Sequence, residues 1–557
     1  MIQILLWAPL AAGLLACAMP QRLVPLPPLL TALTRLGLVI YVVANFNPSL
    51  GLQHTVDESW IPALGVRYQL GVDGISIFLV VLTSVLWLAS TIWSTVNRPE
   101  RPKTWFLMLG LAETATLGAF LAQDLILFVL FFDLMLIPFY FLFGSWGTEH
   151  PGRPEEDEGP IRPQPAVIKM IVYTLVGSLL MLVGAIAAGI LAANGGPIDF
   201  NIQHLAAHPL STASQYWIFW FFAAAFLVKM PAFPLHAWMA DAYRVAPLPA
   251  LALFSGVLSK VGAYGFLRIV LPVFPAATTH FQEVILIVAV ASILYGSVMA
   301  FTQTSARLIL GYSSVAQLGF ITLGIFSLRP DGADGAVLQM VNHGLVIAIV
   351  FARTKTEDVT EMGGQAMRAP ILAALFLVVA MANLAIPGSS NFAGEFYILN
   401  GVFQSKIAFA FVAVIGVGLA AFYSLRMYQK VMHNRLPENA ESREIGLRDG
   451  IVLAPLVAVI IALALWPGLI LDRGEASVTQ KVGAVALADC EVGAYVNRSP
   501  DGADQSAELV TAGSENCTQE YGLSPIEAIS ATFPCGTTHP QGGGYLINFC
   551  DETEGPQ

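Results

Sequence analysis

Hydrophobic runs of about 18–25 residues recur along most of the chain, and their length constrains the fold more than any other feature. A helix of about 20 residues crosses a bilayer, and its backbone polar groups bond within the segment. The 557 residues are 56% apolar and 12% charged, with a mean hydropathy of +0.68. This composition excludes an ordinary soluble protein, and the net charge of −11 argues against nucleic acid as a partner. We expect an all-α polytopic membrane protein.

Fourteen runs are long enough to be transmembrane helices, each embedded in the lipid bilayer. They lie at residues 3–20, 28–46, 73–95, 104–122, 124–144, 169–193, 216–238, 247–271, 281–302, 308–327, 334–352, 370–402, 407–429 and 450–471. If the N-terminus lies outside, most loop lysines and arginines fall on the inner side. The positive-inside bias therefore predicts that both termini lie outside the cytoplasm.

Two segments are too polar for the bilayer. The loop 145–168 contains the Pro-rich, acidic stretch 147–165 and is predicted to be a cytoplasmic excursion. The tail 473–557 is predicted to be extracytoplasmic, and its four cysteines allow two disulfides in any of three connectivities. Their spacing matches no zinc pattern, so we expect no metal there. The tail cysteines are Cys490, Cys517, Cys535 and Cys550, while Cys17 lies in the first span.

Five ionisable side chains lie deep inside different predicted spans. Each costs about 2.5–3.5 kcal/mol or more at a helix centre, so such residues usually pair, line water or take part in transport. A single one could be an isolated polar residue satisfied by nearby backbone, but five together favour a transport site. They are Asp133, Lys229, Lys260, His343 and Glu395.

Two of these residues occupy segments in which a continuous helix is not expected. Lys229 precedes Pro231 and Pro234, and Glu395 follows Pro387 and a glycine. Spans four to eight and nine to thirteen form two blocks of five, and each interrupted segment is the fourth span of its block. Because five is odd, the second block enters the membrane from the opposite side, so the two blocks would be inverted repeats. Paired interruptions of this kind indicate an ion site near the midplane, although a packing kink is the alternative for the prolines. The predicted units are 1–103 (helices one to three), 104–271 and 281–429 (the repeats), 450–472 (the last helix) and the tail 473–557.

Opposite charges on separate helices suggest a relay. Asp133 can stay ionised in lipid if Lys229 lies near it. If the lysine then swings toward Lys260, it can release a proton, which is ion translocation without bond chemistry. His236, seven residues after Lys229, is either part of a proton path or a structural histidine. No phosphate-binding loop, dinucleotide fingerprint or cytoplasmic cysteine cluster is present in the sequence, so the driving energy must come from another subunit or an ion gradient.

Six motifs together are distinctive. They are AFLVKMPAFPLHAWMADAY (225–243), LSKVGAYGFLR (258–268), LGYSSVAQLGF (310–320), MVNHGLV (340–346), RTKTEDVTEMGG (353–364) and PGSSNFAGEF (387–396). These motifs resemble the M chain of respiratory complex I, proton-translocating NADH:quinone oxidoreductase, and the resemblance covers roughly residues 1–472. Mrp-type sodium/proton antiporter chains and membrane-bound hydrogenase subunits belong to the same wider group.

The resemblance implies roles for particular residues. It assigns the five buried ionisable residues to a proton-translocating axis, with Lys169 as an accessory lysine that tunes the Asp133–Lys229 pair. It implies no cofactor in this chain, FMN and iron–sulfur clusters in partner subunits, quinone as electron acceptor, and L-, N- and K-type membrane-arm chains as neighbours. The expected location is an energy-transducing membrane, that of a bacterial cell.

Three departures from the family pattern affect these roles. Asp133 stands where the family usually has glutamate, and Gln317 stands where relatives often have histidine, although an amide cannot relay a proton by changing charge. Between NHGLV and RTKTED the chain has six residues where relatives have about thirteen, which predicts a loss of about 10 Å from span eleven.

Three functions remain open at this point. The chain is expected to be a proton-translocating subunit of the NADH:quinone oxidoreductase enzyme without redox chemistry of its own. The alternatives are a subunit of a sodium/proton antiporter or membrane-bound hydrogenase, and a structural spacer that has lost pumping.

Overall fold

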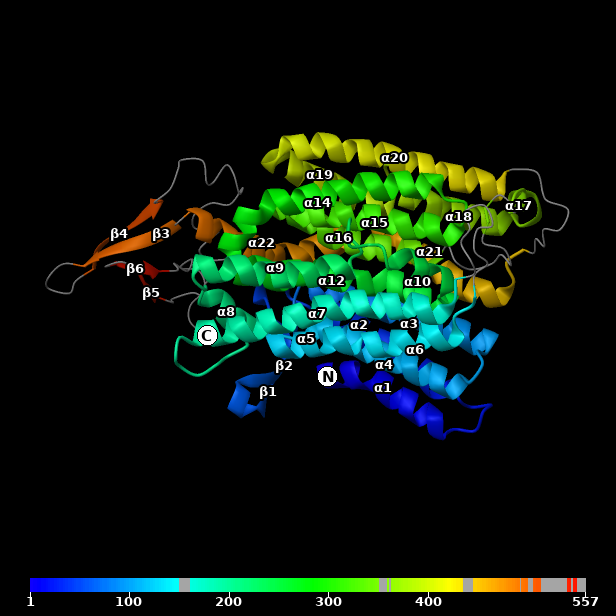
Figure 1. Cartoon of the computed structure of the whole chain (residues 1–557), viewed down its shortest axis with the longest axis horizontal. Coiled ribbons are helices and arrows are strands. Elements are labelled where there is room, and N and C mark those ends of the chain that lie inside the picture. Colours follow the sequence, from blue (N-terminus) through cyan, green and yellow to red (C-terminus); the bar gives the residue numbers. More distant parts are fainter. Residues whose placement is uncertain are drawn as a thin grey trace.

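The structure is a computed structural model in which the helices lie side by side along the long axis of the molecule (Figure 1). It describes residues 1–149, 161–349, 358–359, 362–433, 444–490, 492–498, 504–511, 538–541 and 544–547. Nine helices within these residues are long and apolar enough to cross a membrane, and one bent pair would add a tenth. The chain is thus a mostly helical multi-pass membrane protein, whereas the count of fourteen and the repeat layout stay predictions.

Some helices in the first half of the bundle begin at a proline, as α4 and α7 do, and others at a polar side-chain cap, as α5 and α9 do. The helices are α1 (Ile2–Ala18), α2 (Leu26–Ala44), α3 (Ser76–Asn97), α4 (Pro102–Leu121), α5 (Leu125–Leu134), α6 (Leu136–Trp146), α7 (Pro163–Ala193), α8 (Ile202–Ala207), α9 (Thr212–Lys229), α10 (Met239–Val245), α11 (Leu248–Leu253), the π-helical turn η4 (Phe254–Leu258), α12 (Ser259–Gly265), the π-helical turn η5 (Phe266–Val270) and α13 (Leu271–Val273).

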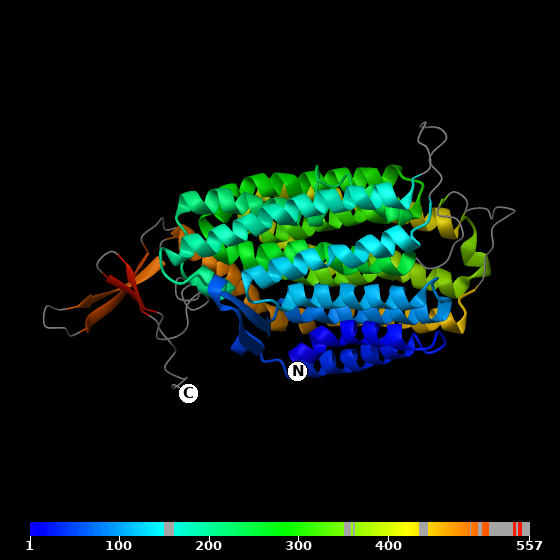
Figure 2. The same cartoon turned by 60° about the horizontal axis from the view of Figure 1, so that its bottom comes forward.

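The second half contains longer helices and the C-terminal elements. These are α14 (Pro275–Thr302), α15 (Ala306–Ile325), α16 (Pro330–Ile349), α17 (Gln365–Arg368), α18 (Pro370–Asn383), α19 (Ser390–Ser405), α20 (Ile407–Met432), α21 (Leu447–Leu465) and α22 (Gly468–Cys490). The turned view in Figure 2 keeps the blue N-terminal helices along one edge and the tail strands at one end.

Strands make the all-α prediction incomplete. Between α2 and α3, β1 (Gln53–Ile61) pairs antiparallel with β2 (Val66–Val72). β1 is mostly polar and exposed, and Gly65 turns the chain with a φ of +71° that glycine adopts readily. Short 3-10 turns, η1 (Pro48–Leu50) and η2 (Pro62–Leu64), flank β1. In the tail, β3 (Val492–Arg498) pairs with β4 (Asp504–Thr511), and β5 (Thr538–Gln541) with β6 (Gly544–Ile547).

Helices extend to the edges of both predicted polar segments. α6 runs to Trp146 and α7 begins at Pro163, a residue preorganised for the first helical position. α21 ends at Leu465, and α22 then continues to Cys490 at an angle of 68° to α21. Its residues Val478 and Val482 are fully buried, so the start of the predicted polar tail packs against the bundle. The predicted tail disulfides involve Cys517, Cys535 and Cys550, which lie outside the described residues.

The helix that carries His343 is longer than we expected from the short connection between NHGLV and RTKTED. It begins at Pro330, four residues before the predicted start, and its 20 residues correspond to a length of about 30 Å. The segment after it, 350–357, lies outside the described residues. The described part of α16 is therefore long enough to cross a bilayer in spite of the shortened connection.

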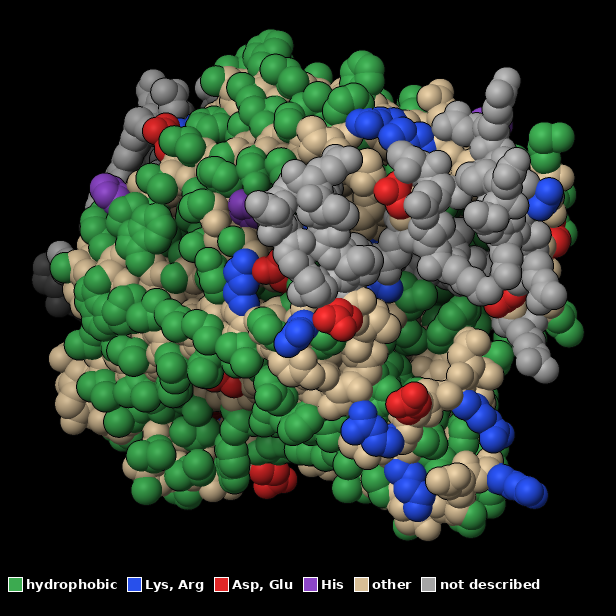
Figure 3. Space-filling model, turned by 45° about the vertical axis from the view of Figure 1, so that its right-hand side comes forward, with side chains coloured by type: hydrophobic (Ala, Val, Ile, Leu, Met, Phe, Trp, Pro, Cys, Tyr) green, Lys and Arg blue, Asp and Glu red, His purple; other side chains and the backbone are tan. Residues whose placement is uncertain are grey.

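The outer surface of the bundle is apolar, as lipid contact requires. On α7, Ile168, Val172 and Val176 are exposed. In Figure 3 hydrophobic side chains cover the flank of the molecule, and lysines and arginines gather toward the end that carries α17. The ionisable residues discussed next lie mostly inside this apolar shell.

Candidate functional site

Interrupted helices position the candidate residues. Lys229 is the last residue of α9, and the chain then turns through the prolines before α10, as predicted. Glu395 lies on α19, which follows a break from Asn383 to Ser390 where Gly388 has a φ of +90°. Sequence reasoning missed two further interruptions: α5 ends one residue after Asp133, and π-helical turns flank the segment that carries Lys260.

Asp133 and Lys229 are neighbours that do not touch. The two side chains interact electrostatically, but they form no ion pair among the described residues, and the Lys229 Nζ has no hydrogen-bond partner there. Instead, this Nζ lies 4.6 Å from the ring centroid of Phe132. The Asp133 carboxylate interacts with Ser178 of α7. It also borders a groove of about 810 Å³ lined by apolar side chains of α5, α6 and α7.

Lys260 and His343 are both completely buried. The Lys260 Nζ donates a hydrogen bond of 2.7 Å to the Ser255 carbonyl oxygen and a longer one of 3.3 Å to the Ser259 hydroxyl. Ser255 belongs to a π-helical turn, a distortion that is frequent at functional sites. His343 on α16 interacts electrostatically with Lys260, and neither ring nitrogen has a hydrogen-bond partner among the described residues.

Amide side chains surround the carboxylate of Glu395. Its Oε1 accepts hydrogen bonds from Gln317 Nε2 at 2.8 Å and from Gln339 Nε2 at 3.5 Å. Gln339 also donates to the Gln317 Oε1 at 2.7 Å. Gln339 lies four residues before His343 on α16, so both side chains share one helix face. Sequence reasoning missed Gln339, and its only sequence signal is an amide one turn before the histidine.

The two accessory residues have partners of their own. Lys169 forms an ion pair with Asp241 of α10, with 2.8 Å between Nζ and Oδ2, and both side chains are partly exposed. His236 is buried beside aromatic rings, with its ring centroid 4.7 Å from that of Tyr295 and 5.7 Å from that of Phe233. The structure therefore records neither residue in contact with Asp133 or Lys229.

The list of ionisable residues inside the spans was incomplete. Arg35 of α2 and Glu113 of α4 form a buried ion pair. Arg268 donates hydrogen bonds to Asp73 and Gln123 in another buried cluster. All of these residues are visible in the sequence, and the opposite signs of Arg35 and Glu113 could have suggested a pair. Their charges are neutralised locally, which suits a structural role.

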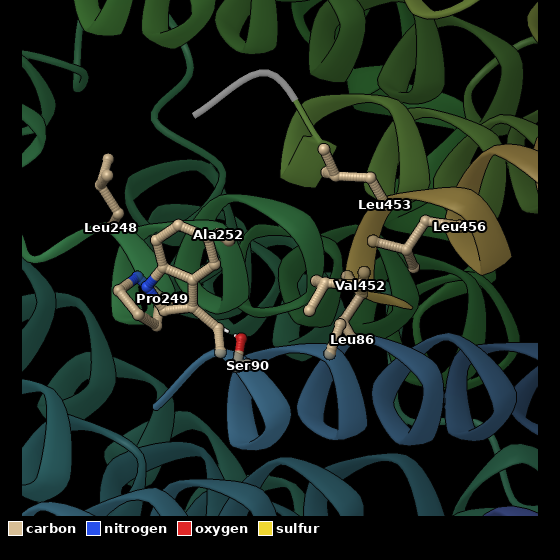
Figure 4. Close-up of a pocket in the computed structure, with 10 residues that line it drawn as sticks. Leu86, Ser90, Leu248, Pro249, Ala252, Val452, Leu453 and Leu456 are labelled. Carbon is tan, nitrogen blue, oxygen red and sulfur yellow. Dashed lines mark hydrogen bonds between the residues drawn. The ribbon is translucent and has the colours of Figure 1, made fainter. Parts of the chain in front are cut away.

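Other features of the described residues give no second site. They contain no group of three or more His, Cys, Asp or Glu side chains that could hold a metal ion. A pocket lies between α3, α11 and α21 (Figure 4). Leu86, Pro249 and Leu456 are among the side chains that line it, and Ser90 donates its hydroxyl to the Pro249 carbonyl oxygen. This pocket contains no ionisable side chain, so it has none of the groups that an ion relay needs.

The fold and these side chains define a class: a multi-pass helical membrane protein with ionisable residues buried beside interrupted helices. Residues 122–420 match the family described as NADH:quinone oxidoreductase/Mrp antiporter, TM. The chain belongs to this family, and within it to the subunit M group of respiratory complex I. It is 35% identical over 461 residues to NADH-quinone oxidoreductase subunit M of Rhodobacter capsulatus, covering 80% of this chain and 87% of the relative. It is 34% identical to subunit M of Mycobacterium tuberculosis (strain H37Rv), covering 84% and 91%.

Solved structures show the same fold. A chain of respiratory complex I from Thermus thermophilus with bound NADH is similar with a TM-score of 0.78 and 27% identity, covering 87% of this chain and all of that one. A chain of the Mrp complex from Dietzia sp. has a TM-score of 0.73 and 21% identity, covering 87% and 98%. The second likeness concerns the fold alone.

Proposed function

We propose that this chain is a proton-translocating membrane-arm subunit of a complex I-like NADH:quinone oxidoreductase. The observation that supports this most directly is the series of buried ionisable side chains beside helix interruptions, in a chain of the subunit M group. Quinone reduction in other subunits drives the movement. FMN, iron–sulfur clusters and the L-, N- and K-type neighbours belong to the assembly, and this chain contributes no redox chemistry.

The proposed path runs through Asp133, Lys229, Lys260, His343 and Glu395. Electrostatic interaction links Asp133 with Lys229 and Lys260 with His343, and the amides of Gln339 and Gln317 connect the α16 face to Glu395. Because the Lys229 ammonium and the Asp133 carboxylate are not in contact, the ion pair has to close and open during turnover. Water has to bridge the remaining gaps, since the two amides cannot relay a proton by changing charge.

Asp133 provides one test of this path. Asp133→Asn removes the negative charge that attracts Lys229, so proton pumping and coupled turnover should fall by about a hundredfold or more, in the range of a lost general acid–base group. Asp133→Glu keeps the charge and adds one methylene toward the lysine, and should preserve or raise both. The measurement is NADH-driven proton uptake by inverted membrane vesicles. Normal pumping by Asp133→Asn would assign the residue to packing alone.

The orientation also belongs to this proposal. The basic loop beside Glu100 should lie in the cytoplasm, and the segment beside Ser49, at the other end of α3, should lie outside. In a background without native cysteines, a membrane-impermeant maleimide added to intact cells should label Ser49→Cys and not Glu100→Cys. Both positions are exposed in the structure. The reverse labelling pattern would contradict the orientation.

Partner subunits distinguish the alternative functions. Co-purification with iron–sulfur and quinone-binding subunits supports the complex I-like assignment, whereas co-purification with other antiporter chains alone supports a sodium/proton exchanger. A spacer would leave pumping unchanged when Lys229 is replaced. The 34–35% identity to subunit M relatives favours the first of these outcomes.

A further inference from the structure

The Phe132 ring is a second neighbour of the Lys229 ammonium, besides the Asp133 carboxylate. Lys229 is 2% exposed, and its Nζ lies over the Phe132 ring, 4.6 Å from the centroid. The negative face of an aromatic ring attracts a cation at this distance, and the attraction is stronger where water is excluded. Phe132 itself is 1% exposed. The ring is therefore the contact that the structure records for this buried ammonium, which has no hydrogen bond among the described residues.

The order of residues on α5 puts two competing partners beside one lysine. Phe132 and Asp133 are consecutive, so their side chains leave the helix about 100° apart. Phe132 points into the bundle, whereas Asp133 is partly exposed at the groove between α5, α6 and α7. The ammonium can thus lie against the ring or move toward the carboxylate, a change of position that the flexible lysine side chain allows.

Neighbouring rings hold Phe132 in place. Its centroid is 6.0 Å from that of Phe226 and 5.9 Å from that of Phe128. Phe226 lies three residues before Lys229 on α9, so the same helix that carries the cation also packs against the ring. Packing on both sides limits rotation of Phe132 and keeps its face toward the lysine.

We propose that Phe132 is a positioning residue that holds the Lys229 ammonium by its ring face when the lysine is released from Asp133. The inference rests on the proposed function, because it says where the protonated Lys229 side chain lies in the state of the relay in which Asp133 no longer holds it. The contact forms no bond and transfers no proton. It stabilises the protonated, unpaired lysine, which would otherwise be a buried cation without any partner. Without the ring, the lysine should remain on Asp133 longer, and each pumping cycle should be slower.

Progressive fluorination of the ring tests this directly. Phenylalanines with one to five fluorines at position 132 keep the ring while they weaken and then reverse the charge of its face. Coupled turnover and NADH-driven proton uptake should fall with each added fluorine, to about a tenth with five fluorines. Phe132→Trp, which has a stronger face, should retain activity, and Phe132→Leu, which removes the attraction without reversing it, should lower activity by no more than five fluorines do.

Phe128 is the matched control. It lies one turn earlier on α5, is buried and packs against the same Phe226, but no cation among the described residues lies over its ring. Fluorination at 128 should leave turnover within twofold. Equal losses at 128 and 132, or no loss at 132, would overturn the role of Phe132. If Lys229→Ala pumps normally, the relay itself is wrong; if Lys229→Ala fails but fluorination at 132 has no effect, only the aromatic contact is wrong.

Discussion

Glu395 illustrates how single residues depend on contacts that a sequence does not show. Its place in an apolar segment made it a candidate, but the two amides that donate to it come from α15 and α16. The Gln317 side chain donates a hydrogen bond of 2.8 Å from Nε2 to the Glu395 Oε1. This geometry suits stabilisation of the carboxylate by a neutral donor rather than proton transfer through the side chain.

Replacing that amide gives a prediction about stability. Gln317→Leu should lower the free energy of unfolding by about 1.5–3 kcal/mol, because a hydrogen bond to a charged group is lost in the interior. Gln282→Leu is the control: Gln282 is also buried but donates to the neutral Phe326 carbonyl oxygen, so the expected loss is about 0.5–1.5 kcal/mol. Reversible denaturation in mixed micelles measures the free energy of unfolding of both variants. Equal losses would argue that Glu395 carries no charge there.

The five ionisable candidates could be identified from sequence, whereas their partners could not. A lone charge in an apolar run is conspicuous because its burial costs free energy. Phe132, Gln339 and Asp241 carry no such signal, since a phenylalanine in a membrane helix, an amide near a helix centre and an acid between two apolar runs are ordinary. Packing of separate helices gives these residues their contacts.

At the scale of elements, proline explains some interruptions of the helices and not others. The breaks after Lys229 and before Glu395 were predicted because proline removes a donor and clashes with the preceding turn. The turn between α5 and α6 at Met135 lies three residues before Pro138, which has no N–H to donate to the Leu134 carbonyl oxygen, and η5 lies just before Pro272. The π-helical turn η4 has no proline in it or in the turn that follows, so proline does not explain that interruption. The β1–β2 hairpin was missed because a search for long apolar runs passes over short polar strands.

The ion pair between α2 and α4 provides a prediction at this scale. Arg35 and Glu113 are buried and paired across these helices. Glu113→Leu alone should destabilise the chain by about 3–5 kcal/mol, because it leaves an unpaired buried charge. The double variant Arg35→Met with Glu113→Leu should recover most of that loss. Proton pumping by the double variant should be unaffected if the pair is purely structural. If the double variant does not recover the stability lost in Glu113→Leu, the two charges stabilise the chain by more than neutralising each other.

Over the whole molecule, membrane class and family were predictable because both depend on features spread along the chain. Long apolar runs indicated a multi-pass protein, and six separate motifs indicated the subunit M group. The packing of α22 against the bundle was not predictable, since its residues are far more polar than those of the other long helices. In the structure, Ser477 of this helix accepts a hydrogen bond from the Gly74 backbone N–H, which connects the end of the described helical bundle to the start of α3.

The central claim is that ionisable residues of this chain move protons, and the proton-to-electron ratio of Lys229→Ala measures it most directly. Lys406→Ala is the control, because that lysine lies near the surface and pairs with Glu283 at 3.5 Å. Both variants should be assembled in the native enzyme and assayed in inverted vesicles for NADH oxidation and proton uptake together. Lys229→Ala should pump fewer protons per electron or lose coupled turnover, while Lys406→Ala should match the unmodified protein. An unchanged ratio and rate in Lys229→Ala would contradict the relay.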